Sequence, residues 1–205
     1  ILNEDNHKKI INNNLKRNMP ACIIYTSGTS GNPKGVVLSH GGILSNCEGA
    51  VELLKPLTNK KKPIFLTWLP LSHSYEHTVQ FIQIIVGAEV FYAESLEKLI
   101  QNMLLVKPTI MTAVPRFYQN LFTKINMSFD KQKGIKKKII NITLNLGKKI
   151  LNKEKINFRE KVINFICNIL IRKKIQNQFG GNLQAFISGG GALDRNIGEF
   201  LNAIG

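Results

Sequence analysis

A loop of small and polar residues in the first part of the chain carries the clearest chemical signal. Residues 23–36 read Ile-Ile-Tyr-Thr-Ser-Gly-Thr-Ser-Gly-Asn-Pro-Lys-Gly-Val, an apolar run that leads into glycines, hydroxyls and one lysine. Glycines let backbone N–H groups approach phosphate oxygens, hydroxyl groups donate further hydrogen bonds, and Lys34 supplies a cation on a flexible stem. The segment therefore predicts a phosphate-binding loop.

The loop differs from the Walker A loop of many nucleotide-binding proteins. That motif requires Gly-x-x-x-x-Gly-Lys-[Ser/Thr] at the start of a helix. Here Lys34 follows Pro33, and residues 36–38 are Val-Val-Leu, which favours a second strand. We therefore expect a hairpin-like loop over a nucleotide, with a turn that has no binding role as the alternative.

The string at 23–36 closely resembles the phosphate-binding loop of the adenylate-forming superfamily, which includes acyl-CoA synthetases, peptide-synthetase adenylation domains and firefly luciferase. Three further segments resemble later motifs of this superfamily in the required order: Leu-Pro-Leu-Ser-His-Ser-Tyr-Glu at 69–76, Lys-Pro-Thr-Ile-Met-Thr-Ala-Val-Pro-Arg at 107–116, and Phe-Ile-Ser-Gly-Gly-Gly-Ala-Leu at 186–193. Ser30, where threonine is usual, and Gly191-Ala192, in place of Ala-Pro, are mild departures. The segment at 107–116 looks like a strand and turn of long-chain fatty acid ligases. A helical insertion before the glycine-rich segment is typical of the bacterial long-chain branch, which narrows the resemblance to long-chain fatty acid–CoA ligases.

The resemblance implies a role for each residue of the loop. Binding of the β- and γ-phosphates of ATP would fall to Thr26, Ser27, Gly28, Thr29, Ser30 and Gly31. Thr26 would also lie near Mg²⁺, and Lys34 near the leaving pyrophosphate. Because magnesium neutralises much of the phosphate charge, a loop rich in hydrogen-bond donors but without carboxylates suits this chemistry.

The resemblance also assigns residues outside the loop. His73 falls where the superfamily has an aromatic or histidine side chain beside the acyl-adenylate. Gly189, Gly190 and Gly191 fall in the glycine-rich strand end that forms one wall of the adenosine and acyl site. A purely structural histidine is the alternative for His73.

The implied activity is that of an AMP-forming acid–thiol ligase. ATP would activate a long-chain fatty acid as acyl-AMP, and coenzyme A, as co-substrate, would then take the acyl group. The resemblance covers residues from about 21 to 205, which implies part of the large N-terminal domain without the C-terminal domain. We expect residues 1–205 to be a fragment with little or no ligase activity alone, and a non-catalytic remnant of such a ligase is the alternative.

A rival hypothesis comes from His73-Ser74-Tyr75-Glu76-His77, which matches H-x-x-E-H, the inverted zinc-protease motif. A zinc metalloprotease needs both histidines one turn apart on a single helix, with a distant acidic third ligand. The preceding Leu-Pro-Leu-Ser instead favours a strand end and a helix cap at His73. One equivalent of bound zinc would support the protease hypothesis.

Short apolar runs alternate with helix-like stretches, the pattern of an α/β protein. The predicted strands cover 21–26, 36–39, 64–69, 89–92, 109–112 and 183–188, and the predicted helices cover 42–54, 75–86, 96–105 and 116–125. Between 131 and 178, isoleucines and leucines recur at helical spacing among lysines and predict a pair of helices inserted in the domain. We expect mixed or parallel sheets covered by helices, within the multi-subdomain N-terminal domain of an adenylate-forming enzyme.

The net charge of +15 invites a nucleic-acid partner, because clustered lysines neutralise phosphates. No aromatic residues alternate with the basic ones as base stacking requires, and lysine, asparagine and isoleucine are abundant throughout, so we expect no nucleic-acid binding. Basic faces of the predicted helical pair could lie on an anionic membrane, or simply be solvated.

The composition also bears on the cellular compartment of the protein. No run approaches the ~20 apolar residues that span a bilayer, so we expect a cytoplasmic protein, with peripheral membrane contact as the alternative. The three cysteines, Cys22, Cys47 and Cys167, lie far apart and predict neither a disulfide framework nor a zinc knuckle.

Overall fold

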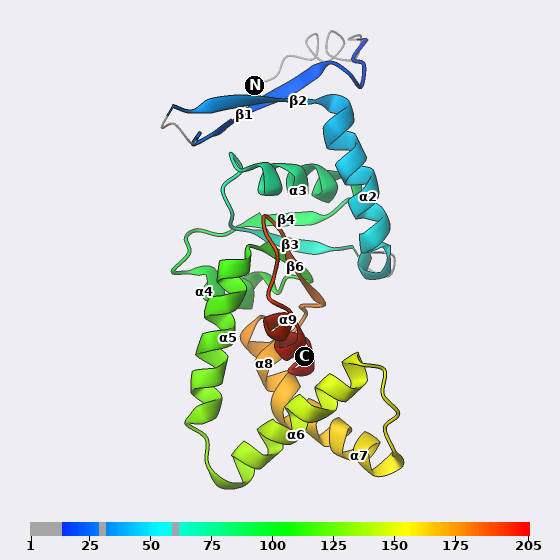
Figure 1. Cartoon of the computed structure of the whole chain (residues 1–205), viewed down its shortest axis with the longest axis vertical. Helices are drawn as coiled ribbons and strands as arrows, with labels where there is room; N and C mark the ends of the chain where they lie inside the picture. The colour runs from blue at the N-terminus through cyan, green and yellow to red at the C-terminus, as the bar shows by residue number, and fades with distance from the viewer. Residues whose placement is uncertain (1–13, 29–31, 59–61) are drawn as a thin grey trace. The chain divides into compact units, whose positions relative to one another are not determined.

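The computed structural model describes residues 14–28, 32–58 and 62–205 (Figure 1). The chain divides into two compact units. The first unit contains the chain up to Pro56 together with Pro70–Ile85, and the second contains Leu57–Leu69 and Val86–Gly205. Each unit is therefore built from two separate stretches of chain.

The first unit contains an antiparallel hairpin of β1 (Pro20–Thr26) and β2 (Lys34–Ser39). Both strands are rich in isoleucine and valine, whose branched side chains favour extended backbone. The strands stay paired as far as Thr26 opposite Lys34, so a regular ladder holds both ends of the loop between them. The expected hairpin is confirmed.

The two faces of the hairpin differ in exposure. On β1, Cys22 and Ile24 are half-buried, whereas the alternate residues Ile23 and Tyr25 expose 56% and 70% of their surface. Successive side chains of a strand point to opposite faces, so this alternation places Cys22 and Ile24 on the same, partly covered face.

Two helices complete the first unit. Helix α2 (His40–Thr58) follows β2 directly, and the Ser39 hydroxyl accepts a hydrogen bond from the Gly42 N–H at 3.1 Å, which satisfies a free donor of the first turn. Helix α3 is Ser74–Ile85. Each helix buries one face, which comprises Ile43, Cys47 and Leu54 in α2 and Glu76, Val79, Ile82 and Gln83 in α3.

The second unit contains a four-stranded parallel sheet of order β4-β3-β5-β6. Its strands are β3 (Ile64–Thr67), β4 (Glu89–Tyr92), β5 (Ile110–Ala113) and β6 (Ala185–Ser188). Every residue of β5 is buried, as expected of a central parallel strand that is covered on both faces.

Helices α4 (Leu99–Val106) and α5 (Pro115–Asp130) belong to the same unit as this sheet. Pro115 occupies the first turn of α5, where its missing N–H costs nothing. The core of the unit gathers side chains from the sheet, from α4 and from the chain just before β6: Leu66, Leu99, Met103, Met111 and Phe179.

The remaining helices are α6 (Gly134–Leu151), α7 (Phe158–Cys167), α8 (Lys173–Gln178) and α9 (Arg195–Ala203), with a π-helical turn, η1 (Asn168–Arg172), between α7 and α8. Asn157 and Glu160 form a reciprocal capping box at the start of α7. Asp194 caps α9 by accepting from two backbone N–H groups.

Two contacts join these helices tightly. Gly147 of α6 lies against Ala203 of α9, so that an added Cβ at 147 would meet the Ala203 Cα and Cβ at 2.5 Å. The buried Arg172 guanidinium donates to the carbonyls of Ala203 at 2.9 Å and Thr143 at 3.3 Å, and to the Asn164 side-chain oxygen at 2.8 Å. Arg172 thus connects α6, α7 and α9 through neutral acceptors.

The structure confirms each predicted strand and helix, with shifted ends at most of them. Between 131 and 178 the expected pair of helices is found, but its second member is not α-helical throughout. Helix α6 is followed by a continuous helical run from Phe158 to Gln178 that changes to π geometry at η1. We expected mixed or parallel sheets. The described residues form two separate sheets, one antiparallel and one parallel.

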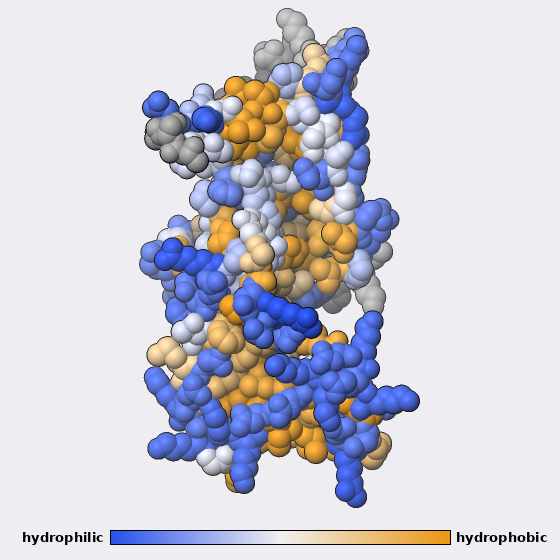
Figure 2. Space-filling view, viewed as in Figure 1, coloured by the Kyte–Doolittle hydropathy of each residue, from blue (hydrophilic) through white to orange (hydrophobic). Residues whose placement is uncertain are grey.

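Helix α7 exposes several apolar side chains at helical spacing, including Phe158 at 80% and Phe165 at 65%. Figure 2 shows hydrophilic and apolar side chains side by side over the region of α6 and α7. None of the helices in the described part of the chain combines the length and apolarity needed to cross a membrane. Contact of the basic helices with a membrane surface stays a prediction.

Candidate functional site

The loop between β1 and β2 is closed by backbone geometry that only glycine tolerates well. Gly28 has φ of +51°, and a Cβ at this position would lie 2.2 Å from the Asn32 carbonyl oxygen. On the β1 side, the Thr26 hydroxyl donates to the Lys34 carbonyl at 3.4 Å across the hairpin. Thr29, Ser30 and Gly31, three of the predicted phosphate-binding residues, lie outside the described residues.

Lys34 begins β2 directly opposite Thr26, and its side chain is exposed. Within the described residues its ammonium forms no salt bridge with a carboxylate. A solvated lysine next to exposed hydroxyls leaves a positive charge available to an anion at the end of the hairpin.

His73 lies just before α3 and caps it. Its carbonyl accepts from the His77 N–H at 2.9 Å, and its Nδ1 accepts from the Tyr75 N–H at 3.4 Å. Because Nδ1 is used within the protein, Nε2 is the ring nitrogen that can contact a ligand. The His73 side chain is exposed, as that role requires.

An open cavity of about 670 Å³ brings these parts of the first unit together. Its walls come from the end of β1, from the turn before α3 and from the first turn of α3: residues Cys22, Ile23, Ile24, Tyr25, Thr26, Ser27, Pro70, Leu71, Ser72, His73, Ser74 and His77. The structure thus places Thr26, Ser27 and His73 around one cavity, although they are far apart in the sequence.

Tyr75 lies beside this cavity, in the first turn of α3. Burial, and to a lesser extent the neighbouring Glu76 charge, raises the pKa of Tyr75 to about 12. The phenol therefore keeps its proton at alkaline pH values at which an exposed tyrosine would ionise.

The predicted glycine wall lies in the second unit. Gly189 follows β6 and donates its N–H to the Ala113 carbonyl at 3.1 Å, Gly190 has φ of +74°, and a Cβ on Gly191 would contact Pro115 at 3.5 Å. The turn is thus packed against the start of α5. Because these glycines belong to a different unit from Thr26 and His73, their sharing of one site stays a prediction.

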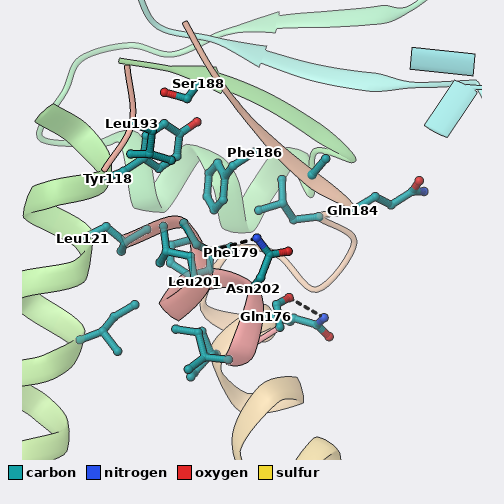
Figure 3. A pocket seen from close by; sticks show the side chains of 17 residues that line it. Tyr118, Leu121, Gln176, Phe179, Gln184, Phe186, Ser188, Leu193, Leu201 and Asn202 are labelled. Atoms are coloured by element: carbon teal, nitrogen blue, oxygen red, sulfur yellow. Dashed lines mark hydrogen bonds between the residues drawn. The ribbon is translucent and has the colours of Figure 1, made fainter. Parts of the chain in front are cut away.

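A second cavity, of about 240 Å³, lies in the second unit beneath β6 (Figure 3). Apolar side chains line most of it, among them Leu121, Phe179, Phe186, Leu193 and Leu201. The Ser188 hydroxyl oxygen at its edge is buried and has no hydrogen-bond partner within the described residues. Sequence analysis missed this cavity, because its residues come from α5, α8, β6 and α9 and share no motif.

The described residues do not form the site that the zinc-protease hypothesis requires. His73 precedes α3 instead of sharing the helix with His77, and Glu76 is fully buried. The His77 Nε2 lies 3.5 Å from the Cys22 sulfur, and its ring packs edge-on against Phe81. Over residues 14–28, 32–58 and 62–205, no group of three or more histidine, cysteine, aspartate or glutamate side chains could hold a metal ion.

Comparison with known proteins agrees with the geometry of the hairpin. A family model described as AMP-binding enzyme matches residues 2–205. The chain belongs to the AMP-binding enzyme family. This membership, together with the α/β architecture, confirms the resemblance on which the expected fold depends.

The curated relatives of this AMP-binding enzyme include long chain acyl-CoA synthetase 3 of Arabidopsis thaliana, 32% identical over 92% of the chain and 29% of the relative. Long chain acyl-CoA synthetase 6, peroxisomal, of the same plant is 31% identical over 88% of the chain and 25% of the relative. The chain thus spans less than a third of the length of these relatives.

Solved structures show the same fold. The adenylation domain of a carboxylate reductase from Mycobacterium chelonae superposes with a TM-score of 0.60 at 20% identity, over 92% of this chain and 25% of that one. ATP-bound MatB from Rhodopseudomonas palustris gives 0.55 at 18% identity, over 90% and 27%. At these identities the likeness concerns the fold of the AMP-binding enzymes alone.

Proposed function

We propose that the full-length protein activates a carboxylic acid with ATP and transfers the acyl group to coenzyme A. The observation that carries this proposal is the end of the hairpin, where Thr26, Ser27 and Lys34 surround a loop closed by Gly28. Hydroxyls, backbone N–H groups and the exposed Lys34 ammonium form a suitable environment for a polyphosphate. His73 lines the cavity of about 670 Å³ together with Thr26 and Ser27.

In the proposed first step, a carboxylate oxygen attacks the α-phosphorus of ATP in line with the leaving pyrophosphate. An O–P bond forms to give acyl-AMP, and the bond to the β-phosphate oxygen breaks. The reaction needs positioning and charge neutralisation more than a protein nucleophile. Lys34 would stabilise the charge of the leaving pyrophosphate, and Thr26 and Ser27 would orient the phosphates.

In the second step the CoA thiol takes the acyl group. The thiol sulfur attacks the carbonyl carbon of acyl-AMP, a C–S bond forms, and AMP leaves with the electrons of the broken C–O bond. Of the described residues in the first unit, His73 would border the acyl-adenylate in this scheme, by the resemblance.

Magnesium would accompany ATP in this scheme. The donors at the end of the hairpin are hard oxygen atoms, which suit Mg²⁺, but in the described part of the loop they are hydroxyls without a carboxylate. Thr26 would therefore be the protein ligand, with phosphate oxygens and water supplying the other positions. When bound, the ion neutralises phosphate charge.

A long-chain fatty acid is the substrate that the relatives favour. Both curated relatives named above are long chain acyl-CoA synthetases, at 32% and 31% identity over most of this chain. Because the chain covers 29% and 25% of their lengths, the activity is proposed for the full-length protein and not for residues 1–205 alone.

The test is ATP–pyrophosphate exchange driven by a panel of carboxylic acids, measured on the full-length protein and on its Lys34→Ala variant. We expect exchange with long-chain acids and a loss of about 100-fold in the variant, the usual cost of removing one charge-stabilising group. Lys136→Ala, which removes an exposed lysine from α6, serves as the control and should exchange like the parent.

The outcomes separate the candidate functions. Exchange with short or aromatic acids alone would replace the fatty acid by another substrate while keeping adenylation. Absence of exchange with every acid, from protein that is folded by circular dichroism, would favour a non-catalytic remnant.

A further inference from the structure

A cysteine and a histidine that both line the cavity in the first unit lie next to each other. The Cys22 sulfur lies 3.5 Å from the His77 Nε2, with Cys22 on β1 and His77 in the first turn of α3. At this distance a thiol can donate a hydrogen bond to an imidazole nitrogen, or a thiolate can accept one. Neither the superfamily motifs nor the proposed adenylation reaction uses this pair.

The histidine ring is held in place by its surroundings. Its ring packs edge-on against Phe81, with centroids 5.3 Å apart at 80°, and its backbone N–H donates to the His73 carbonyl. The backbone bond fixes the position of residue 77 in the helix, and the contact with Phe81 restricts the ring, whose Nε2 faces the sulfur. An imidazole held next to a thiol acts as a base that takes the thiol proton, which is the usual way a cysteine becomes a good nucleophile.

Access distinguishes Cys22 from the other cysteines of the chain. Cys47 and Cys167 are 0% and 2% exposed, whereas Cys22 is half-buried and lines the cavity of about 670 Å³. A small reagent that enters this cavity therefore meets one thiol and its base. Thr26, Ser27 and His73 line the same space, so an adduct on the sulfur would occupy room beside them.

We propose that Cys22 is a covalent modification site for small disulfides and other soft electrophiles, and that His77 activates it. The thiol proton passes to His77 Nε2, and the sulfur attacks one sulfur of the disulfide. A new S–S bond forms, the old one breaks, and the departing thiolate takes up a proton. Cys22 is oxidised to the mixed disulfide while half of the reagent is reduced to a thiol.

The modification also has a consequence that rests on the proposed function. If the cavity receives the phosphates of ATP, then a mixed disulfide at Cys22 and ATP compete for the same space. The modified protein should lose adenylation, and a thiol reductant should restore it. Bound ATP, in turn, should slow the reaction of the Cys22 thiol with disulfides.

The first experiment measures modification alone, on the folded full-length protein. Glutathione disulfide and iodoacetamide are the probes, and peptide mass spectrometry follows Cys22, Cys47 and Cys167 separately. We expect Cys22 to react at least about tenfold faster than the two buried cysteines, and His77→Gln to slow it by about tenfold. His40→Gln, a histidine change at the start of α2, is the matched control and should not alter the rate.

Two results would overturn the proposal: equal reactivity of Cys22 and the buried cysteines, or unchanged reactivity in His77→Gln. His77→Phe provides a second variant, since it keeps an aromatic ring against Phe81 and removes both nitrogens. If His77→Gln unfolds, His77→Phe must show the slower reaction instead.

The second experiment adds ATP and compares exchange before and after treatment with glutathione disulfide. Protection of Cys22 by ATP, with loss of exchange in the parent but not in Cys22→Ser, supports the linked proposal. A reactive Cys22 that ATP leaves unprotected contradicts nucleotide binding in this cavity and keeps the modification site. ATP-dependent exchange with an inert Cys22 contradicts the modification site and keeps adenylation.

Discussion

The hairpin β1–β2 and the central strand β5 are both built from apolar residues, yet they differ in what those residues do. Every residue of β5 is buried in the second unit, whereas Ile23, Tyr25 and Val37 of the hairpin expose 56%, 70% and 58% of their surface. Packing therefore selects the residues of β5. In the hairpin, the pairing of the two backbones and the conformation of the loop constrain the sequence more than packing does. Substitutions there should therefore affect binding more than folding.

The largest expected effect on stability lies where α6 meets α9. Gly147→Ala places a Cβ 2.5 Å from the Ala203 Cα and Cβ, so the helices must separate, at a cost of about 2–3 kcal/mol in the free energy of unfolding. Gly49→Ala is the matched control, because nothing lies within 4 Å of its Cβ, and helix propensity should stabilise it by about 1 kcal/mol. Urea denaturation measures both, and equal effects would contradict tight packing of the second unit.

A somewhat smaller loss is expected from Arg172→Met. The variant leaves the Thr143 and Ala203 carbonyls and the Asn164 side chain without their shared donor, at a cost of about 2 kcal/mol. Arg159→Met, on the exposed side of α7, should change the free energy of unfolding by less than about 0.5 kcal/mol. If thermal unfolding shows the same midpoint for both variants, the buried hydrogen bonds contribute nothing to stability.

A substitution in the hairpin should reduce activity more than stability, unlike the two substitutions in the second unit. Gly28→Ala forces a left-handed alanine and a contact of 2.2 Å with the Asn32 carbonyl oxygen, so the loop must change shape. We expect ATP–pyrophosphate exchange to fall by at least about tenfold, and the free energy of unfolding to fall by only about 1–2 kcal/mol.

Gly87→Ala separates these two effects. It imposes a similar backbone penalty at φ of +62°, but no atom lies within 4 Å of the new Cβ and the residue belongs to the second unit. It should lose about 1 kcal/mol of stability and retain exchange. An equal loss of exchange in the two variants would show that general strain, and not the loop, governs activity.

The smallest effect concerns Tyr75 at alkaline pH. Its pKa of about 12 in the folded protein lies above the ordinary value of 10, so between pH 10 and 12 the folded protein holds the proton that the unfolded protein loses. The free energy of unfolding should therefore decrease across this interval, and Tyr75→Phe should reduce the slope. Tyrosinate absorbance of the two proteins gives the pKa directly, and a Tyr75 titration near pH 10 would contradict the burial.

Local patterns were sufficient to predict most of the fold. Apolar runs bounded by polar turns located the strands, and the order of loop, Lys34 and second apolar run predicted the hairpin; the pairing of Thr26 with Lys34 came from the structure. Helical spacing also predicted α6 and the helical run from Phe158 to Gln178, but not the π geometry of η1 within that run. Its change to π geometry lies at Arg172, whose partners in α6 and α9 are 29 and 31 residues away along the chain.

In the candidate site, too, the features that are local in sequence were predictable and those that depend on distant residues were not. Residue types and spacing identified Gly28 and Lys34, because a loop motif is local in sequence. The pairing of Cys22 with His77 spans 55 residues and depends on how β1 lies against α3, which no periodicity encodes. The same holds for the cavity beneath β6, whose lining comes from four separate elements.

The division of the chain into two discontinuous units also limits how proteolysis, truncation or recombination can separate them. The first unit resumes at Pro70 after the second has begun at Leu57, and the second resumes at Val86. No single cleavage of the backbone can separate the two units, and no contiguous stretch of gene encodes either of them alone. Genetic exchange within this part of the protein must therefore transfer pieces of both units together or disrupt both.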